Sequence, residues 1–384
     1  MDYSGLKNEL DLRRAEHLYR SRRLLQSPQS VEPIIDGKKV LSFCSNDYLG
    51  LANHPEVIKS FKYAADQYGV GSGSAHLVTG HSIEHHALEE ELADFMGTER
   101  ALLFSTGYMA NLGVISALCD RHSEIYEDKL NHASLLDAAL LSRAKRIRFP
   151  HRDVTNLENR ILGSDNKNKF IVSDGVFSMD GDLAPLDKLV NLSEKSKATL
   201  MIDDAHGIGV LGEKGKGVIE QFGIETKQVP VLIGTLGKAF GTAGAFVAGS
   251  DDLIETLIQK SRSYIFTTAM PAAIAAATRK SLQLLGKETW RREKLQTLVR
   301  QFRAGAAELN LTLVDSMTAI QPVIVGSSEQ TLDFSEKLLE QNVLISAIRP
   351  PTVPEGTARL RVTFSAAHTE EHVDKLLSVL SAVR

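Results

Sequence analysis

The chain has 384 residues, of which 43% are hydrophobic and 24% are charged, and this length favours two closely packed domains. A net charge of -4 at pH 7 gives no electrostatic reason to expect nucleic acid or an anionic membrane surface as a partner. Cys44 and Cys119 lack the spacing of a zinc or CxxC site, so we expect a reduced, cytoplasmic protein without a bound metal. The first 23 residues are too charged for a signal peptide, and no apolar run reaches the roughly 18 residues of a membrane span.

The chain divides into three segments by composition and periodicity. Within residues 1–44, the charged, helix-favouring composition up to about Arg23 predicts an N-terminal helix, and a short hairpin is predicted around Asp36-Gly37. Residues 45–285 alternate short apolar runs with amphipathic helices, which predicts a large α/β domain with a mostly parallel sheet. Residues 286–384 predict a smaller α+β domain. The strands expected in the large domain are 101–104, 169–173, 199–203, 229–234 and 244–248, and a helix with an apolar face is expected to end at Gly97.

Three polar clusters follow expected strands of the large domain. They are SDGVFSMDGD (173–182), MIDDAHGIG (201–209) and IGTLGKAFGTAG (233–244). Ligands of such sheets bind at the carboxyl ends of the strands, so we expect these clusters to meet at one edge. Asp203, at the end of a buried strand, needs a cationic partner such as a pyridinium, a metal or an arginine, whereas Asp204 is expected to be structural or solvent-facing.

A single lysine, Lys238, lies among glycines and small apolar residues. It is either a loop lysine whose amine reaches water or a lysine kept neutral for a Schiff base, because desolvation lowers its pKa. The segment FSTGYMAN (104–111) places Ser, Thr and Gly before an expected helix, where free N–H groups bind an anion such as phosphate or are simply capped. The Thr235 hydroxyl could serve the same anion.

Six motifs together resemble a known family. They are SNDYLGL (45–51), NHAS (131–134), GVFSMDGD (175–182), DDAHG (203–207), TLGK (235–238) and RPPTVP (349–354). In this order they are similar to the α-oxoamine synthases, which are homodimeric enzymes of the aspartate aminotransferase fold (fold type I) that use pyridoxal 5'-phosphate (PLP). The stretch AIRPPTVPEGTARLR favours the branch that condenses L-alanine with a pimeloyl thioester, on coenzyme A or a carrier protein, in biotin biosynthesis. The branch that joins glycine to acetyl-CoA is the alternative.

The resemblance implies a role for each matching residue. Lys238 would hold PLP and move a proton, Asp203 would pair with the pyridinium nitrogen, and His206 would bond the ring's phenolic oxygen. His132 would stack on the ring and meet the substrate. The further contacts implied are Gly107, Tyr108 and Thr235 with the phosphate, Ser178 with the cofactor, Arg349 with the amino-acid carboxylate, and Thr352 and Arg20 with substrate near the acyl entrance.

Two further stretches are given simpler interpretations. His81, His85 and His86 have zinc-like spacing, but HExxH is absent and no cysteine is near, so a polar helix face is favoured. The glycine-rich run 69–80 lacks the GxGxxG and GK[ST] spacings of nucleotide loops, which argues against a nicotinamide oxidoreductase. In the resembling family this run lies near the active site across a dimer interface. A PLP protein without turnover is disfavoured because Lys238, Asp203, His206 and His132 are all present.

Overall fold

The computed structural model describes residue 3 and residues 5–383. The chain forms two compact units. The smaller unit comprises residues 1–46, 179–181 and 294–384, and the larger comprises residues 47–178 and 182–293. The domain boundaries expected from the sequence, near residues 45 and 286, stay a prediction.

The larger unit is built on a seven-stranded sheet in the order β4-β10-β9-β8-β7-β5-β6. Strands β9, β8, β7, β5 and β6 are parallel, and β10 runs antiparallel to both of its neighbours. The expected α/β fold with a mostly parallel sheet is therefore confirmed. The strands are β4 (Arg100–Phe104), β5 (Glu124–Asp128), β6 (Lys145–Phe149), β7 (Lys169–Asp174), β8 (Thr199–Asp203), β9 (Val231–Thr235) and β10 (Ala245–Gly249).

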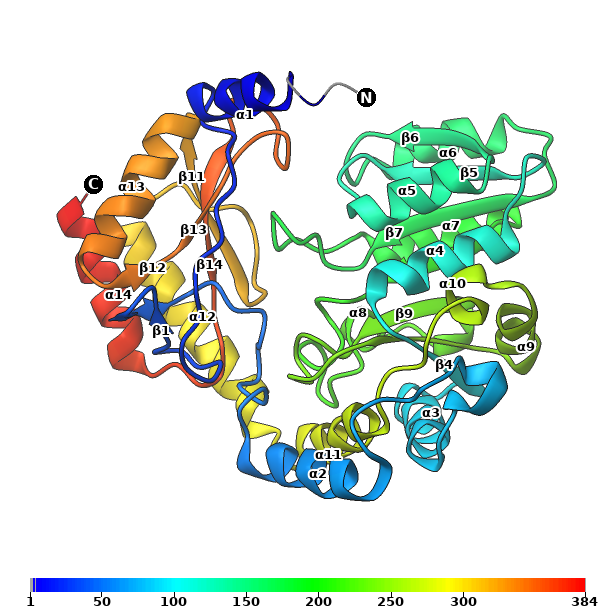
Figure 1. Ribbon diagram of the computed structural model, residues 1–384. Coiled ribbons are helices and arrows are strands. Elements are labelled where there is room, and N and C mark those ends of the chain that lie inside the picture. The colour runs from blue at the N-terminus through cyan, green and yellow to red at the C-terminus, as the bar shows by residue number, and fades with distance from the viewer. Residues whose placement is uncertain (1–2, 4, 384) are drawn as a thin grey trace. The chain divides into compact units, whose positions relative to one another are not determined.

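Helices cover this sheet, so its central strands are buried. Apolar residues on one face of the sheet, such as Val172, Met201 and Ile233, join a core with side chains of α4, α5 and α9. Helices α4 and α9 contact β4, and α10 contacts both of these helices (Figure 1). The helices are α2 (Pro55–Tyr68), α3 (Ile83–Met96), α4 (Gly107–Leu118), α5 (Ala133–Leu141), α6 (Val154–Leu162), α7 (Leu186–Ser196), α8 (Val218–Gln221), α9 (Asp251–Lys260), α10 (Arg262–Ile265) and α11 (Ala272–Lys287), with shorter turns η1 (His76–Gly80) and η2 (Thr226–Gln228).

The strand register brings the expected polar clusters together. Asp174 of β7 lies opposite Asp203 of β8, and Asp203 lies opposite Ile233 of β9. The chain leaves all three parallel strands at the same edge, which places the residues after β7, β8 and β9 side by side. The expected meeting of the three clusters at one edge is confirmed.

Local signals near two helices act as the sequence predicts. Gly97 ends α3 in the left-handed conformation at φ 75°, which glycine adopts without steric cost. Thr106 precedes α4, and its hydroxyl accepts the Met109 N–H at 3.1 Å. The first N–H groups of α4 point out of the helix end, because no carbonyl group within the helix accepts them.

The smaller unit contains an antiparallel sheet in the order β11-β14-β13 and a parallel pair, β12-β3. The expected hairpin is present, with Asp36 and Gly37 at φ 50° and 79° in its turn. The elements of the smaller unit are α1 (Gly5–Ala15), β1 (Ile34–Ile35), β2 (Lys38–Lys39), β3 (Leu41–Ser42), most of α12 (Trp290–Glu308), β11 (Ile320–Gly326), α13 (Ser328–Glu340), β12 (Val343–Leu344), β13 (Ser346–Ile348), β14 (Ala358–Thr363) and α14 (Glu370–Val383).

The N-terminal helix is shorter than its composition suggests. It ends at Ala15, and His17 follows at φ 58°, outside the helical region. Since none of the residues of α1 is buried, packing does not extend it toward Arg23. In the part of the chain that the structure describes, no helix is long and apolar enough to cross a membrane.

Candidate active site

Lys238 lies at the carboxyl edge of the sheet, three residues after β9, and contacts a histidine. Its Nζ is 2.8 Å from Nε2 of His206, which follows β8. The other ring nitrogen of His206, Nδ1, is 2.5 Å from the hydroxyl of Tyr48, a fully buried residue. A hydrogen-bonded chain thus runs from Tyr48 through His206 to Lys238, and it fixes the ring so that Nε2 faces the lysine.

Asp203 is held by a second network. Its Oδ2 accepts a hydrogen bond from the Asn111 side chain at 2.6 Å, and its Oδ1 accepts the Ala205 N–H at 3.0 Å. Asn111 also donates to the Ser134 hydroxyl at 2.8 Å, and that hydroxyl lies 2.7 Å from Nδ1 of His132. Burial and then the charge of Lys238 lower the pKa of His132, against the charge of Asp203. Its ring is therefore neutral near pH 7.

Two more carboxyl groups lie beside Asp203. Burial, and then the negative charge of Asp203, raises the pKa of Asp174 well above its usual range. Burial also raises the pKa of Asp204, which is wholly inside the protein and accepts the Val218 N–H at 2.8 Å. Asp204 is thus structural and not solvent-facing. Several carboxyl groups are therefore buried together at this edge of the sheet. A cation bound there would stabilise their charged forms and so lower their pKa values.

The expected phosphate contacts lie on two elements of this unit. Gly107 and Tyr108 open α4, where helix geometry leaves their N–H groups without partners inside the helix. A Cβ atom built on Gly107 would meet nothing within 4 Å, so there is open space beside this residue where a side chain would stand. The Tyr108 hydroxyl donates to Asp137, and the Thr235 hydroxyl donates to the Gly244 carbonyl at 3.1 Å.

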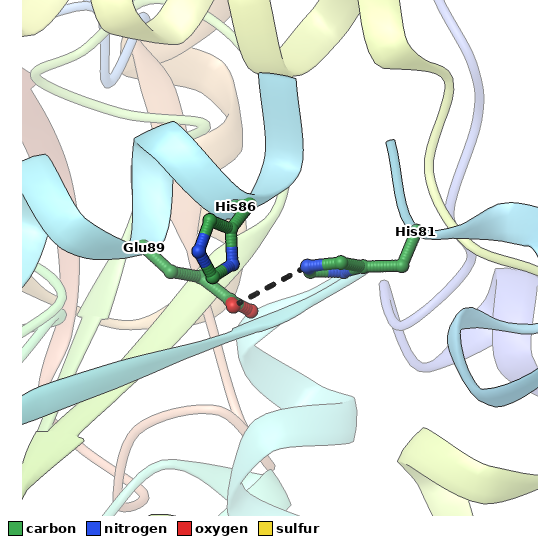
Figure 2. A group of neighbouring side chains, drawn as sticks. All are labelled: His81, His86 and Glu89. Carbon is green, nitrogen blue, oxygen red and sulfur yellow. Dashed lines mark ion pairs between the residues drawn. The ribbon is translucent and has the colours of Figure 1, made fainter. Parts of the chain in front are cut away.

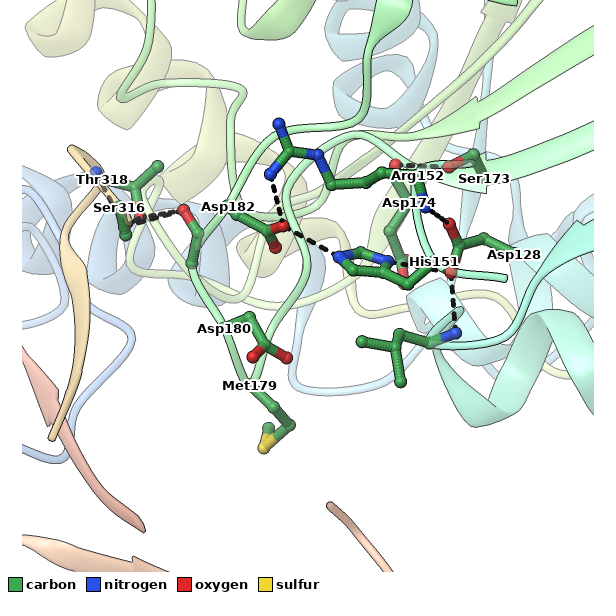
Figure 3. Close-up of polar contacts among 12 residues, drawn as sticks. Asp128, His151, Arg152, Ser173, Asp174, Met179, Asp180, Asp182, Ser316 and Thr318 are labelled. Atoms are coloured by element: carbon green, nitrogen blue, oxygen red, sulfur yellow. Dashed lines mark hydrogen bonds and ion pairs between the residues drawn. The ribbon is translucent and has the colours of Figure 1, made fainter. Parts of the chain in front are cut away.

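An ion cluster holds the loop after β7, which carries Ser178 (Figure 3). His151 Nδ1 is 3.0 Å from Asp128 and its Nε2 is 2.8 Å from Asp182. Arg152 also binds Asp182, at 3.0 Å. Both ring nitrogens of His151 must donate, because carboxylates only accept. Burial lowers the pKa of His151, but the hydrogen bonds that its ring donates to these two carboxylates outweigh burial and raise the pKa to about 9.

Three of the expected substrate residues, those at positions 20, 349 and 352, belong to the smaller unit, and the fourth, His132, belongs to the larger one. The Arg349 guanidinium donates to the His17 carbonyl, and its Nε is buried without a hydrogen-bond partner among the described residues. Burial and the nearby charge of Arg20 lower the pKa of Arg349. Thr352 and Arg20 are exposed. The roles assigned to these three residues stay predictions.

The histidines at the start of α3 separate in the structure. His85 is buried, with Nε2 at 2.7 Å from the Met270 carbonyl, so it is a structural residue. His81 and His86 instead lie near Glu89. Burial lowers the pKa of His81 and raises that of Glu89 to about 7.

The comparisons with known proteins cover almost the whole chain. The sequence pattern described as "Aminotransferase class I and II" matches residues 38–380. The chain belongs to this family. It is also 59% identical over 376 residues to an 8-amino-7-oxononanoate synthase of Thioalkalivibrio sulfidiphilus, covering 98% of this chain and 96% of that one. This relative confirms the resemblance to the α-oxoamine synthases.

Solved structures agree with this assignment. A serine palmitoyltransferase from Sphingomonas wittichii superposes with a TM-score of 0.94 at 32% identity, covering 99% of this chain and 96% of that one. An 8-amino-7-oxononanoate synthase from Francisella tularensis gives a TM-score of 0.79 at 32% identity, covering 89% and 97%. The chain therefore has the fold of the class I and II aminotransferases, as expected.

Three side chains with structural links to the site carried no role in the sequence analysis. Tyr48 contacts His206, Asn111 joins Asp203 to Ser134, and His151 holds the loop of Ser178. Tyr48 lies in the motif SNDYLGL and Asn111 lies in FSTGYMAN. A polar group among apolar residues was the signal that could have identified both. His151 follows a strand without such a signal.

We expect Tyr48→Phe to lower kcat about 10- to 100-fold, because a buried ring nitrogen loses its partner at a cost of roughly 1–3 kcal/mol. Steady-state kinetics and the absorbance of bound cofactor test this. Tyr126→Phe is the matched control, since the Tyr126 hydroxyl is equally buried but bonds Glu124. It should affect stability and leave kcat unchanged. Equal kcat in wild type and Tyr48→Phe would contradict the proposed positioning of His206.

The His151 cluster predicts a pH-dependent stability. A pKa raised from 6.5 to about 9 stabilises the folded protein fully below pH 6.5, and this contribution is lost as pH rises through 9. The difference in Tm between wild type and His151→Gln should therefore be largest below pH 6.5 and shrink above pH 9. Thermal melts across this range measure it, with exposed His122→Gln as control. A difference that does not change with pH would show that His151 is not charged.

Proposed function

We propose that this chain synthesises 8-amino-7-oxononanoate in biotin biosynthesis. L-alanine condenses with a pimeloyl thioester, and carbon dioxide and the free thiol are released. The observation that carries the proposal is the 59% identity to a synthase of that name over nearly the full length of both chains. The site agrees with it, because Lys238, Asp203 and His206 lie at one edge of the sheet.

The residues present fit PLP, the cofactor of this function. Lys238 offers an amine for a Schiff base. Buried carboxyl groups surround Asp203, and a pyridinium nitrogen is a cation that would stabilise their negative charge. The free N–H groups at the start of α4 suit a phosphate, and the space beside Gly107 is open. In this assignment the N–H groups of Gly107 and Tyr108 would hold the phosphate, and the Thr235 hydroxyl would turn from the Gly244 carbonyl to donate to it. His132 and Ser178 would contact the cofactor.

The chain's own residues then hold and move protons. When bound, PLP withdraws electrons from the amino-acid α-carbon, and this stabilises negative charge there. Lys238 Nζ takes and returns the α-proton, as a general base and acid must within hydrogen-bond reach. His206, 2.8 Å from this nitrogen, orients it and would bond the phenolic oxygen of the cofactor. His132, whose ring is neutral, would contact the cofactor without adding positive charge.

Arg349 is assigned to the carboxylate of alanine. Its buried Nε lacks a hydrogen-bond partner among the described residues, and a buried donor of this kind needs an acceptor. A guanidinium binds a planar carboxylate through two parallel hydrogen bonds. Thr352 and Arg20 are assigned to the acyl substrate.

The remaining parts of the proposal concern surroundings and partners. We place the enzyme in the cytoplasm, where Cys44 and Cys119, both free thiols, stay reduced. We also propose a homodimer with shared active sites. The glycine-rich segment 69–80 supports it, since Val70, Leu77 and Val78 are exposed apolar side chains that a second copy could cover. The acyl donor is pimeloyl-CoA or a pimeloyl carrier protein.

The function is tested by product formation from defined substrates. Purified protein with PLP is given alanine, glycine or serine, each with pimeloyl-CoA, acetyl-CoA or palmitoyl-CoA. We expect 8-amino-7-oxononanoate from alanine and pimeloyl-CoA at a far higher kcat/KM than any other pair gives. Preferred use of glycine with acetyl-CoA would instead identify the alternative branch. Serine with palmitoyl-CoA is included because serine palmitoyltransferases share this fold.

Arg349→Lys should raise the KM for alanine at least tenfold, because lysine cannot form the paired hydrogen bonds of a guanidinium. The absorbance of bound PLP should remain as in the wild type. Arg20→Ala serves as the comparison, and it should raise the KM for the thioester only. If both variants change only the thioester KM, Arg349 does not bind the alanine carboxylate.

A further inference from the structure

Three side chains at the start of α3, outside the proposed active site, bring ligand atoms together. One nitrogen or oxygen of each of His81, His86 and Glu89 lies within 4.8 Å of the other two. His81 Nε2 is 3.9 Å from Glu89 Oε2. Figure 2 shows His86 and Glu89 projecting from the helix toward the ring of His81.

The local backbone explains this gathering. His86 and Glu89 are three residues apart on α3, so their side chains are neighbours on one helical face. His81 stands just before Ser82, the residue that caps the helix. The Ser82 N–H donates to His85 Nδ1 at 3.0 Å, which fixes the direction in which the chain enters the helix. His81 is thereby turned back over the first turn.

In His81 and Glu89, the ligand atom that would not bind a metal already has a hydrogen-bond partner in the protein. His81 Nδ1 lies 3.0 Å from Nδ1 of His76, and a hydrogen on the His81 nitrogen leaves Nε2 with a lone pair toward Glu89. Glu89 Oε1 accepts the Leu103 N–H at 2.9 Å, so Oε2 is the oxygen directed at His81. Metal-binding histidines and carboxylates are held in this way by partners on their other atoms.

The surrounding charge favours a cation. The three side chains line a cavity of about 280 Å³ together with Glu90, Glu99 and Arg100. Arg100 directs its guanidinium to Asp251 at 2.7 Å and Glu255 at 3.4 Å. These two partners do not line the cavity, whereas the carboxyl groups of Glu89, Glu90 and Glu99 do, so carboxyl groups outnumber cations in its lining.

We propose that His81, His86 and Glu89 bind one divalent transition-metal cation, for which zinc is the best match. Two imidazoles and one carboxylate, with water in the fourth position, form a known zinc ligand set. Zinc bonds of about 2.0–2.1 Å place tetrahedral ligand atoms about 3.3 Å apart, so the group must contract. The His86 side chain is 60% exposed and lies 3.5 Å from Glu90, and because such an exposed pair is weak, the ring can leave it and turn inward. The bound ion would fasten the turn η1 and His81 to α3.

Zinc binding to the untagged holoenzyme, stripped of metals with a chelator and re-saturated with PLP, tests this. Isothermal titration with zinc chloride should give one ion per chain. Both His86→Ala and Glu89→Gln should weaken binding at least tenfold, and Glu89→Gln keeps the acceptor for the Leu103 N–H. His122→Ala, an exposed histidine on the turn before β5, should bind zinc as the wild type does.

Cobalt(II) gives a second readout that needs no catalytic activity. We expect the intense visible bands of a tetrahedral cobalt site in wild type and His122→Ala, and their loss in His86→Ala. Thermal melts confirm that each variant is folded. Absence of stoichiometric binding to the wild type overturns the proposal, as does equal affinity in wild type, His86→Ala and Glu89→Gln.

Discussion

The burial of several carboxyl groups at one edge of the parallel sheet is the constraint on which the larger unit depends. Asp174 and Asp203 lie opposite each other in β7 and β8, and Asp204 follows at once. Small residues make room for them: a Cβ on Gly207 or Gly217 would come within 2.1 Å or 1.8 Å of an Asp204 oxygen. Burying such groups is costly, so the site needs backbone hydrogen bonds and a cation. The glycines leave room for the carboxyl groups, the Asn111 amide and the Val218 N–H donate hydrogen bonds to them, and Lys238 is a cation nearby.

Rigid elements, rather than mobile side chains, hold the groups that would do the chemistry. Asn111 on α4 fixes Asp203 at the end of β8, and Tyr48, before α2, fixes His206. Each linking side chain is at least 99% buried, so it cannot easily exchange its partner for water. Groups fixed in this way need little reorganisation during a reaction, which is how proteins position acids and bases accurately.

Other buried carboxylates of the larger unit lie beside a basic side chain. In β5, Glu124 pairs with Lys145 at 2.8 Å, and Glu127 pairs with Arg146 at 2.8 Å, both across to β6. His151 lies between two carboxylates at the end of this strand pair. A buried ion that loses its partner destabilises a protein strongly, so the two ion pairs favour the pairing of β5 with β6, and the His151 contacts hold the loop that follows β7.

Sequence alone determined the features that depend on neighbours along the chain. Apolar runs predicted β7, β8 and β9, and the motifs around Asp203 and Lys238 identified the family. The strands β5 and β6, EIYED and KRIRF, escaped prediction because their charges pair between strands and hide the apolar pattern. Only the tertiary structure decided that Asp204 is buried, that Tyr48 contacts His206, and that His81, His86 and Glu89 converge. Periodicity reports which face of an element is buried, whereas these contacts join side chains that only packing brings together.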